Sequence, residues 1–267
     1  MVEIKELVML FDFDKTIIEC DSDDWVIQNL GFTELFNTLL PTMPYNSLMD
    51  RIMGELHSQG TTIQDIAEWL IKVPLSPNIT HAIKSAYASG CDLRIVSNAN
   101  TFFIETILKH NGVLHCFSEI NTNPVSIEED GRLKILPYHD FNSSSHGCNL
   151  CPPNLCKGLV LRRIQASSVK KRFVYVGDGK NDYCPSLKLT TIDYVMPRKH
   201  LPLWDAICSD PTLISASIHE WEDANELGRM LINLISILMM KPNHDLAFED
   251  YVSGDCKSSY DSAHGSS

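Results

Sequence analysis

The sequence contains no long hydrophobic run. None of its 267 residues belongs to a stretch of about 18 consecutive apolar residues, so we expect no membrane span. The most apolar segment, 227–240, is short and interrupted by Gly228, Arg229 and Asn233, which indicates a helix packed on a core. A Lys/Arg-rich run is absent too: 22 basic against 34 acidic residues give a formal charge of -12. This balance argues against a protein that binds nucleic acid through a basic surface.

A basic leader is also lacking. The first ten residues, MVEIKELVML, carry two Glu and no cluster of basic residues, so we expect no secretory or mitochondrial signal. Nine cysteines are an odd number, and without a secretory signal they predict reduced thiols and a cytoplasmic location. After Asn243 the chain is polar, Ser-rich and aperiodic, which predicts a disordered tail over 243–267.

What the sequence does contain is an alternation of strand-like and helix-like segments. Near-continuous apolar runs separated by helical patterns are typical of a parallel sheet that is covered on both faces. The expected fold class is therefore α/β. We expect strands over Val8–Phe13, Asp92–Asn98, Arg172–Gly179 and Asp193–Arg198.

Between the first two strands the pattern is helical. One expected helix has Asn46 as its cap and ends at Gly60; another has Ser76 as its cap, Pro77 at its first position and Gly90 as its stop. Three or four helices here predict an insertion, of which the last helix belongs to the core. The expected division is a core of 1–19 and 76–242, a helical insertion over 20–75, and the tail over 243–267.

Two aspartates follow the first apolar run. Asp12 and Asp14 lie one residue apart at the carboxyl end of the strand, where α/β sheets place their active sites, and alternation puts both on one face. Carboxylates this close raise each other's pKa unless a cation such as Mg²⁺ neutralises them. One could then attack phosphorus while the other moves a proton. The alternatives are a solvated turn or a calcium loop, but Ile17 stands where an EF-hand requires Gly.

The stretch VYVGDGKNDYCPSL brings a second acidic strand end. Its glycines permit tight turning and close approach of the backbone. Asp178 could complete a metal site with Asp12, and Asp182 could hold the metal through water or orient a lysine. Gly and Asp are also common in ordinary strand-to-helix turns, but a second acidic strand end in one chain weakens that alternative.

Two further segments supply groups that suit a phosphate. Ser97 ends a strand and can donate its hydroxyl, and the helix expected from Asn100 or Thr101 has free N–H groups that could face an anion. Lys157 stands at the start of a helix-like run. If buried, it could balance phosphate charge and pair with Asp12 or Asp182.

These four segments, DFDKT, VSN, NLCKG and GDGKND, resemble the haloacid dehalogenase superfamily of phosphatases over about Val8 to Arg198. The resemblance implies a Rossmann-like parallel sheet core with an inserted helical cap over the site. It implies a cytoplasmic Mg²⁺-dependent phosphatase that forms an aspartyl-phosphate. The implied roles are Asp12 as nucleophile, Asp14 as general acid/base, Ser97 and Lys157 as phosphate ligands, Asp12, the Asp14 carbonyl and Asp178 as Mg²⁺ ligands, and Asn181 and Asp182 as supporting residues.

Longer stretches such as DFDKTIIECDSDDWV and GDGKNDYCPSLKL resemble the phosphoethanolamine/phosphocholine phosphatase family. The tract ILPYHDFNSSSHGCNLCPPNLCKG is similar to its plant branch of thiamine phosphate phosphatase-like proteins. In the amino-alcohol phosphatases an Asp follows the Ser of the second motif and, with one that matches Asp23, faces the substrate's ammonium. Here Asn98 takes that place, and because Asn carries no charge, a cation-seeking pocket is weakened.

The first substrate candidate is therefore thiamine monophosphate. Aromatic side chains could also stack on its delocalised thiazolium ring. The candidate aromatic residues are Trp25, Phe32, Trp69 and Tyr87. The alternatives are a phosphocholine/phosphoethanolamine phosphatase, an inorganic pyrophosphatase, a phosphotransferase, or a non-catalytic sensor of a phosphate ligand. The expected partner is a small phosphorylated metabolite, with no nucleic acid and no membrane; the sequence does not define the oligomeric state.

A group of cysteines remains outside this scheme. Cys148, Cys151 and Cys156 lie close together, with His139 and His146 nearby. Cys-x-x-Cys with a further Cys and a His could form a structural zinc site, but the spacing is irregular and a second pair is absent. Reduced thiols that shape the loop before the lysine are the alternative.

Overall fold

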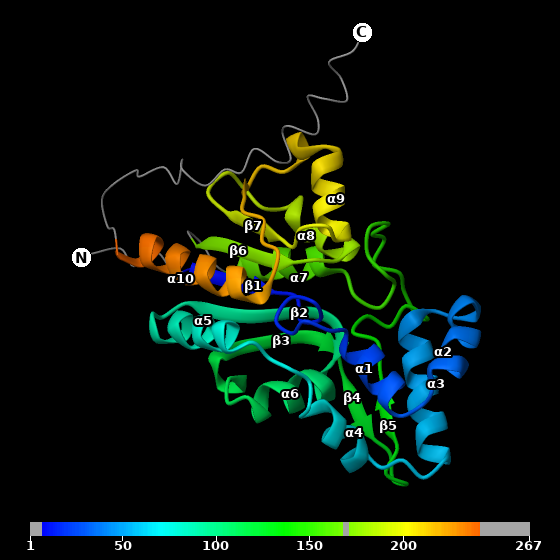
Figure 1. The fold of residues 1–267 in the computed structure, drawn as a ribbon. Helices are drawn as coiled ribbons and strands as arrows, with labels where there is room; N and C mark the ends of the chain where they lie inside the picture. Colours follow the sequence, from blue (N-terminus) through cyan, green and yellow to red (C-terminus); the bar gives the residue numbers. More distant parts are fainter. Residues whose placement is uncertain (1–6, 168–170, 241–267) are drawn as a thin grey trace.

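The computed structural model describes residues 7–167 and 171–240. Its centre is a six-stranded parallel sheet in the order β3-β2-β1-β6-β7-β8 (Figure 1). The strands are β1 (Leu7–Phe11), β2 (Asp92–Asn100), β3 (Phe117–Asn123), β6 (Arg172–Gly177), β7 (Tyr194–Pro197) and β8 (Ser217–Ile218). The predicted α/β class with a Rossmann-like parallel sheet is confirmed.

Helices cover both faces of the sheet because its central strand is apolar on both sides. All five residues of β1 are buried; Met9 and Phe11 pack into one core, and Val8 and Leu10 into another. The first core includes α5 (Pro77–Ala88), α6 (Thr101–His110) and α10 (Ala224–Met240), and the second includes α7 (Lys157–Ala166) and α9 (Pro202–Ser209). Burial on both faces is what gives the strand its unbroken apolar sequence.

Five helices lie between β1 and β2, one more than the periodicity predicts: the last is α5, and four precede it. Those four are α1 (Ser22–Asn29), α2 (Thr33–Leu39), α3 (Tyr45–Ser58) and α4 (Ile63–Leu70), with a 3₁₀ turn η1 (Leu40–Thr42). A hairpin from later in the chain, β4 (Val125–Ile127) and β5 (Leu133–Ile135), lies beside α3 (Figure 1). The Ile135 N–H donates to Asp50 of α3 at 3.0 Å, and Arg132 pairs with the same carboxylate at 2.9 Å. The sequence did not predict this hairpin, and the boundaries of core and cap stay a prediction.

Helix ends follow their local signals in most places. The Ser76 hydroxyl accepts the N–H of Asn78 at the start of α5, and Gly90 has a φ of 82° just after its end. The expected Asn46 cap is wrong: α3 begins at Tyr45 after Pro44, which fixes an extended backbone without a side-chain cap. The remaining short elements are α8 (Tyr183–Ser186), η2 (Leu114–Cys116), η3 (Lys180–Asp182) and η4 (Pro211–Leu213).

Strand ends differ from the sequence expectation by up to two residues. β1 stops at Phe11 rather than Phe13, and β6 stops at Gly177 rather than Gly179, while β2 continues to Asn100. Asp12 and Asp14 therefore lie beyond the strand, so strand alternation does not position them. The predicted tail over 243–267 lies outside the described residues. Within those residues, no helix is long and apolar enough to cross a bilayer.

Candidate active site

A polar cavity lies where the carboxyl ends of the central strands meet. From β1 the sheet continues to β2 and β3 on one side and to β6, β7 and β8 on the other, which makes β1 its topological switch point. The cavity has a volume of about 200 Å³. Its lining residues are Asp12, Asp14, Lys15, Asp21, Asp23, Tyr45, Ser97, Asn98, Ala99, Asp178, Gly179 and Asn181.

Asp12 is held at the floor of this cavity by two partners. Its Oδ1 accepts the N–H of Phe13 at 2.7 Å, and its Oδ2 lies 2.7 Å from the Lys157 ammonium. Lys157 is fully buried at the first position of α7, and its ammonium also donates to Asp182 at 2.8 Å. A buried ammonium between two carboxylates fixes the orientation of Asp12.

Asp182 has all of its acceptor positions engaged. One oxygen accepts Lys157 and, at 2.6 Å, the hydroxyl of Tyr175; the other accepts the N–H groups of Asp178 and Gly179 at 3.1 and 2.9 Å. This carboxylate also explains Gly177, because a Cβ there would lie 2.6 Å from the Asp182 Cγ. The glycine serves close approach, as the sequence indicated. Two roles were predicted for Asp182, holding the metal through water and orienting a lysine. Its contacts support the second role.

Asp12 and Asp178 fit a hard cation. Carboxylate oxygens of Asp12, Asp178 and Asp182 all lie within 4.8 Å of one another. With Asp182 committed to hydrogen bonds, Asp12 and Asp178 are the pair that can turn an oxygen to a metal, and oxygen donors suit Mg²⁺. Thr16 donates to Asp178 Oδ1 at 2.9 Å, an outer contact that orients the carboxylate.

The electrostatics of the site favour added positive charge. Burial and then Asp182 raise the pKa of Asp12 well above its usual value, although Lys157 opposes the shift. Burial and Asp182 likewise raise the pKa of Asp178 to about 6. Although burial alone lowers the pKa of Lys157, the two carboxylates raise it above its ordinary value. Three buried carboxylates thus share one ammonium, an imbalance that a divalent cation would relieve.

Asp14 reaches the same cavity from a tight turn after β1. Its Oδ1 accepts the N–H of Ser22, the first residue of α1, at 2.8 Å. Lys15 adopts a φ of 55°, which turns the chain sharply at this point. Burial, and then the charge of Asp21, raise the pKa of Asp14 to about 7. The turn, and not the strand pleat, brings Asp12 and Asp14 to one cavity.

Residues near the end of β2 form another wall of the cavity, apart from Asp14 and α1. Ser97 is buried and lines the cavity, and its Oγ accepts the N–H of Ala99 at 3.3 Å. Asn181 donates through Nδ2 to Asn98 Oδ1 at 2.6 Å. The helix predicted from Asn100 or Thr101 is α6, with Asn100 as the cap that accepts the N–H of Phe103. Lys157, in contrast, touches Asp12 from behind and is not among the lining residues.

The insertion supplies an acidic end to the cavity. Asp23 is buried, and its Oδ1 has no hydrogen-bond partner. Burial, then Asp21 and Asp14, raise the pKa of Asp23 well above its usual value, and a hydrogen bond from Tyr45 opposes the shift. A buried carboxylate oxygen without a partner is costly, so this position is suited to a donor on a ligand.

The four aromatic side chains expected to stack on a ligand do not line the cavity. Trp25 donates through its indole N–H to the Trp69 carbonyl at 2.9 Å, and Tyr87 contacts His115 away from the site. Tyr45 is the aromatic residue among those that line it. Sequence reasoning also missed Thr16, Tyr175 and Lys15. The first and last lie inside the DFDKT motif, but Tyr45 and Tyr175 carry no local signal of their role.

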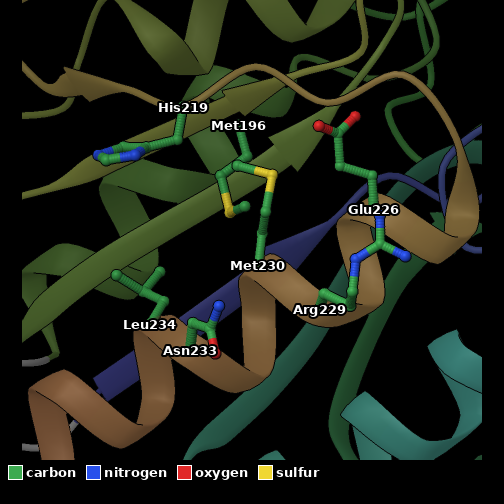
Figure 2. Close-up of a pocket in the computed structure, with 7 residues that line it drawn as sticks. All are labelled: Met196, His219, Glu226, Arg229, Met230, Asn233 and Leu234. Atoms are coloured by element: carbon green, nitrogen blue, oxygen red, sulfur yellow. The ribbon is translucent and has the colours of Figure 1, made fainter. Parts of the chain in front are cut away.

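A second hollow, of about 250 Å³, lies beside α10 (Figure 2). Met196 of β7 faces Met230 and Leu234 of α10 across it, with Glu226 at its rim (Figure 2). It shares no lining residue with the aspartate cavity. Its largely apolar wall lacks the paired carboxylates that chemistry on a phosphate requires.

Comparison with known proteins agrees with this geometry. The family described as Putative Phosphatase matches residues 7–235. The chain is 52% identical over 268 residues to an Arabidopsis thaliana protein named inorganic pyrophosphatase 2, covering 99% of this chain and 96% of that protein. It is 53% identical over 237 residues to an A. thaliana thiamine phosphate phosphatase-like protein, covering 87% and 97%.

The fold also matches a solved structure. A substrate-bound phosphoserine phosphatase complex superposes with a TM-score of 0.58 at 16% identity, covering 86% of this chain and 99% of that one. This likeness concerns the fold. Together with the matched family, it confirms the resemblance drawn from the four motifs. The chain therefore belongs to the Putative Phosphatase family and is a phosphoric monoester hydrolase, and its fold is that of haloacid dehalogenase-type hydrolases.

Proposed function

We propose that the protein hydrolyses a small phosphomonoester through an aspartyl-phosphate on Asp12. An oxygen of Asp12 attacks phosphorus as the bond from phosphorus to the leaving oxygen breaks, and Asp14 gives its proton to that oxygen. Asp14 then takes a proton from water, whose oxygen attacks phosphorus and releases Asp12. The observation that carries this proposal is the contact of Asp12 with the Lys157 ammonium at 2.7 Å, where both side chains are buried at the floor of the cavity.

The state of Asp14 supports its proposed role. With a pKa raised to about 7, this carboxyl holds a proton in a large share of molecules near neutral pH. A group poised in this way can give a proton in one step and accept one in the next. Its contact with the Ser22 N–H fixes it on the α1 side of the cavity.

We assign Mg²⁺ to Asp12, Asp178 and the Asp14 backbone carbonyl. Bound there, it would neutralise the carboxylates and stabilise charge on the phosphoryl oxygens. On the wall near the end of β2, Ser97 offers a hydroxyl and α6 its N-terminal N–H groups. Lys157 would act mainly through Asp12, because it contacts that carboxylate directly.

The acidic end of the cavity bears on the substrate. The unpartnered Asp23 oxygen favours a leaving group with positive charge or N–H donors. Thiamine monophosphate is the first candidate, because a relative 53% identical is named thiamine phosphate phosphatase-like. Its two-ring leaving group is large for a cavity of about 200 Å³, so part of this group would lie outside the residues that line the cavity.

Inorganic pyrophosphate is the second candidate. It is favoured by the name of the relative that matches 99% of this chain, and by the small, polar cavity. Lys15, which lines the cavity near Asp21, is the cation available to a second phosphoryl group. The two candidates differ in charge, so Asp23 should favour thiamine monophosphate and oppose pyrophosphate.

The deciding experiment is phosphate release with Mg²⁺ and with EDTA across a panel. The panel is thiamine monophosphate, phosphocholine, phosphoethanolamine, pyrophosphate, phosphoserine and p-nitrophenyl phosphate. One substrate that dominates in kcat/KM and loses turnover in EDTA supports the proposal and names the substrate. Absence of hydrolysis by folded, Mg²⁺-binding protein would instead favour a sensor of a phosphate ligand. Transfer to added alcohols at the expense of water would favour a phosphotransferase.

A further inference from the structure

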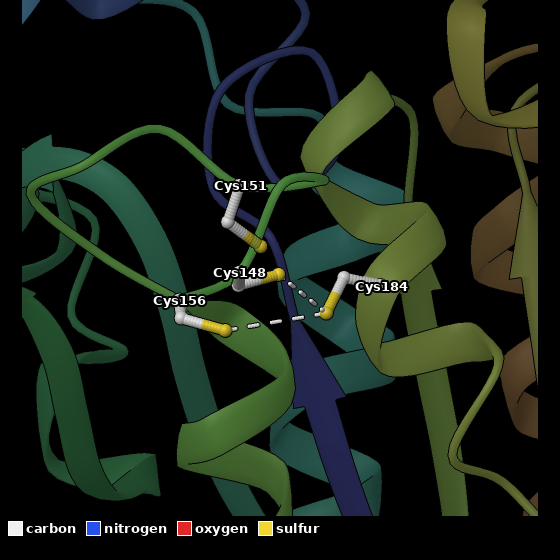
Figure 3. A group of neighbouring side chains, drawn as sticks. All are labelled: Cys148, Cys151, Cys156 and Cys184. Carbon is white, nitrogen blue, oxygen red and sulfur yellow. Dashed lines mark hydrogen bonds between the residues drawn. The ribbon is translucent and has the colours of Figure 1, made fainter. Parts of the chain in front are cut away.

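Four cysteine side chains gather beside the active site from three separate segments. Cys148 and Cys151 lie in the loop after β5, Cys156 immediately precedes α7, and Cys184 belongs to α8 (Figure 3). Their sulfur atoms all lie within 4.8 Å of one another, and each is a free thiol. Cys156 and Cys184 are 1% exposed, and the other two are half-buried. Sequence reasoning found three of these residues but missed Cys184, which follows the GDGKND motif.

The spacing of the sulfur atoms fits a shared metal. The Cys148 and Cys184 sulfurs are 3.6 Å apart, and those of Cys156 and Cys184 are 4.0 Å apart. Zinc bound tetrahedrally by thiolates at about 2.3 Å would separate the sulfurs by about 3.8 Å. A disulfide would bring two of them to about 2.05 Å and leave the others unpaired. The observed separations lie on both sides of the tetrahedral value.

The nearby histidine does not join the group, and the Cys151 thiol contacts the backbone carbonyl of Asn181 at 3.9 Å. His146, which sequence reasoning considered as a ligand, is engaged in the loop: its Nε2 lies 2.9 Å from the Pro152 carbonyl, and its Nδ1 accepts the Cys148 N–H at 3.1 Å. These contacts fold the loop so that Cys148 faces Cys184. Sulfur ligands of this kind select thiophilic ions such as zinc and not Mg²⁺.

We propose that Cys148, Cys151, Cys156 and Cys184 bind a structural zinc ion. The site is closed, with four protein ligands and no position for a substrate, which is typical of structural zinc. It is separate from the carboxylate site, whose oxygen donors suit a different ion.

The position of the zinc gives it a clear structural consequence. Cys156 precedes Lys157, and Cys184 follows Asp182 by two residues, so the ion would tie together the two segments whose side chains form the buried ion pair. The helices already approach closely here, because a Cβ on Gly158 would lie 2.5 Å from the Cys184 sulfur. Zinc would thus fix the distance between Lys157 and Asp182, and through Lys157 the orientation of Asp12.

The test is the metal content of the full-length protein. The protein is purified without chelators under reducing conditions, and its zinc is measured by inductively coupled plasma mass spectrometry. We expect about one zinc per chain, and about tenfold or greater loss of affinity in Cys184→Ser and in Cys148→Ser. Cys91→Ser is the matched control, since Cys91 is a buried thiol outside the group. Asp178→Asn should also keep its zinc, which separates this site from the carboxylates.

A second measurement covers the case in which a serine variant does not fold. Cobalt exchanged into the wild-type protein should give the intense thiolate charge-transfer absorption of a tetrahedral sulfur site. A mercurial reagent should release the zinc of the wild type as it titrates the thiols. Protein that holds no zinc after reconstitution, serine variants that bind it as tightly as wild type, or a mapped Cys148–Cys184 disulfide in the reduced, active protein would each overturn the proposal.

Discussion

Asn98 and Asn181 join two segments across the cavity: the Asn181 side-chain amide donates to the side-chain oxygen Oδ1 of Asn98 at 2.6 Å. Asn98 lies in β2, two residues before its end, and Asn181 in η3 after β6, on the two sides of β1. The pair is neutral, and it occupies the place where amino-alcohol phosphatases carry an Asp. Position 98 therefore adds no charge to the cavity that the Asp23 carboxylate also lines.

Asn98→Asp should shift the substrate preference toward cations. The new carboxylate can still accept from Asn181, and it adds negative charge to the cavity wall. We expect kcat/KM for phosphocholine and phosphoethanolamine, relative to p-nitrophenyl phosphate, to rise by about tenfold. Asn98→Ser is the control that removes the amide without adding charge. An unchanged ratio in the Asp variant would show that the residue at position 98 does not determine the preference for cationic substrates.

Asp23→Asn tests the acidic end of the cavity. The substitution keeps the size of a buried side chain whose Oδ1 lacks a partner but removes its charge. Hydrolysis of thiamine monophosphate should fall by about tenfold in kcat/KM, mainly through KM, while pyrophosphate hydrolysis should be maintained or improved. Asp24→Asn, one residue along and less buried, is the matched control. Equal losses with both substrates would show that Asp23 serves packing and not charge recognition.

Asp12→Asn should abolish turnover while leaving the fold intact. An amide has nearly the same shape but is not a nucleophile toward phosphorus, so we expect a loss of at least about 10⁴-fold in kcat. Circular dichroism and Tm check the fold, and Glu68→Gln, at an exposed position of α4, is the control. Trapping of a phosphorylated wild-type enzyme, absent in the variant, would identify the intermediate directly. An active Asp12→Asn variant would rule out Asp12 as the nucleophile.

Much of this site could be predicted from the sequence because its residues stand at strand ends and helix starts. Asp12, Ser97 and Asp178 each follow an apolar run, and Lys157 opens a helix, so local patterns place them at one edge of a parallel sheet. Neither the sheet order nor the distances were needed for that prediction. Even the wrong end of β1 did not matter, because the turn after Phe11 returns Asp14 to the same cavity.

The rest depends on contacts that leave no local pattern. β3 was missed because FSEINTN is an edge strand with polar side chains, of which Glu119 pairs with Arg94 of β2. The β4–β5 hairpin is stable because it packs on α3, more than 65 residues earlier in the chain. Tyr45 and Cys184 reach their sites in the same way. The local sequence around each of them does not indicate its role, which depends on neighbours that only the tertiary structure provides.

Removal of Mg²⁺ should stop turnover, and a neighbour of the metal site should tune the amount required. Thr16 donates to Asp178 at 2.9 Å, so Thr16→Val frees that carboxylate to rotate while keeping the side-chain volume. We expect the Mg²⁺ concentration for half-maximal activity to rise by about tenfold, with kcat restored at saturation. Thr38→Val in α2, at an exposed position, is the control. An unaltered requirement would argue that Asp178 does not bind the metal.

Lys157→Met should destabilise the protein, because it leaves Asp12 and Asp182 buried without their shared cation. Loss of one partner from a buried ion pair costs about 3–5 kcal/mol in the free energy of unfolding. The cost should depend on pH. The folded state raises the pKa of Asp12, so it binds a proton more tightly than the unfolded chain, and the stability contributed by Asp12 falls as pH rises from the unfolded pKa through the folded one.

Without Lys157 the charge that opposes this shift is gone, so the decline in stability should continue to higher pH. Denaturant unfolding of both proteins in EDTA, from about pH 5 to pH 8, would measure it. Lys180→Met, which removes an exposed lysine of η3, is the matched control and should leave the free energy of unfolding within about 0.5 kcal/mol of the wild type. A loss of the same size at every pH would mean that Asp12 does not titrate in the folded protein, and that Lys157 stabilises the fold by packing alone.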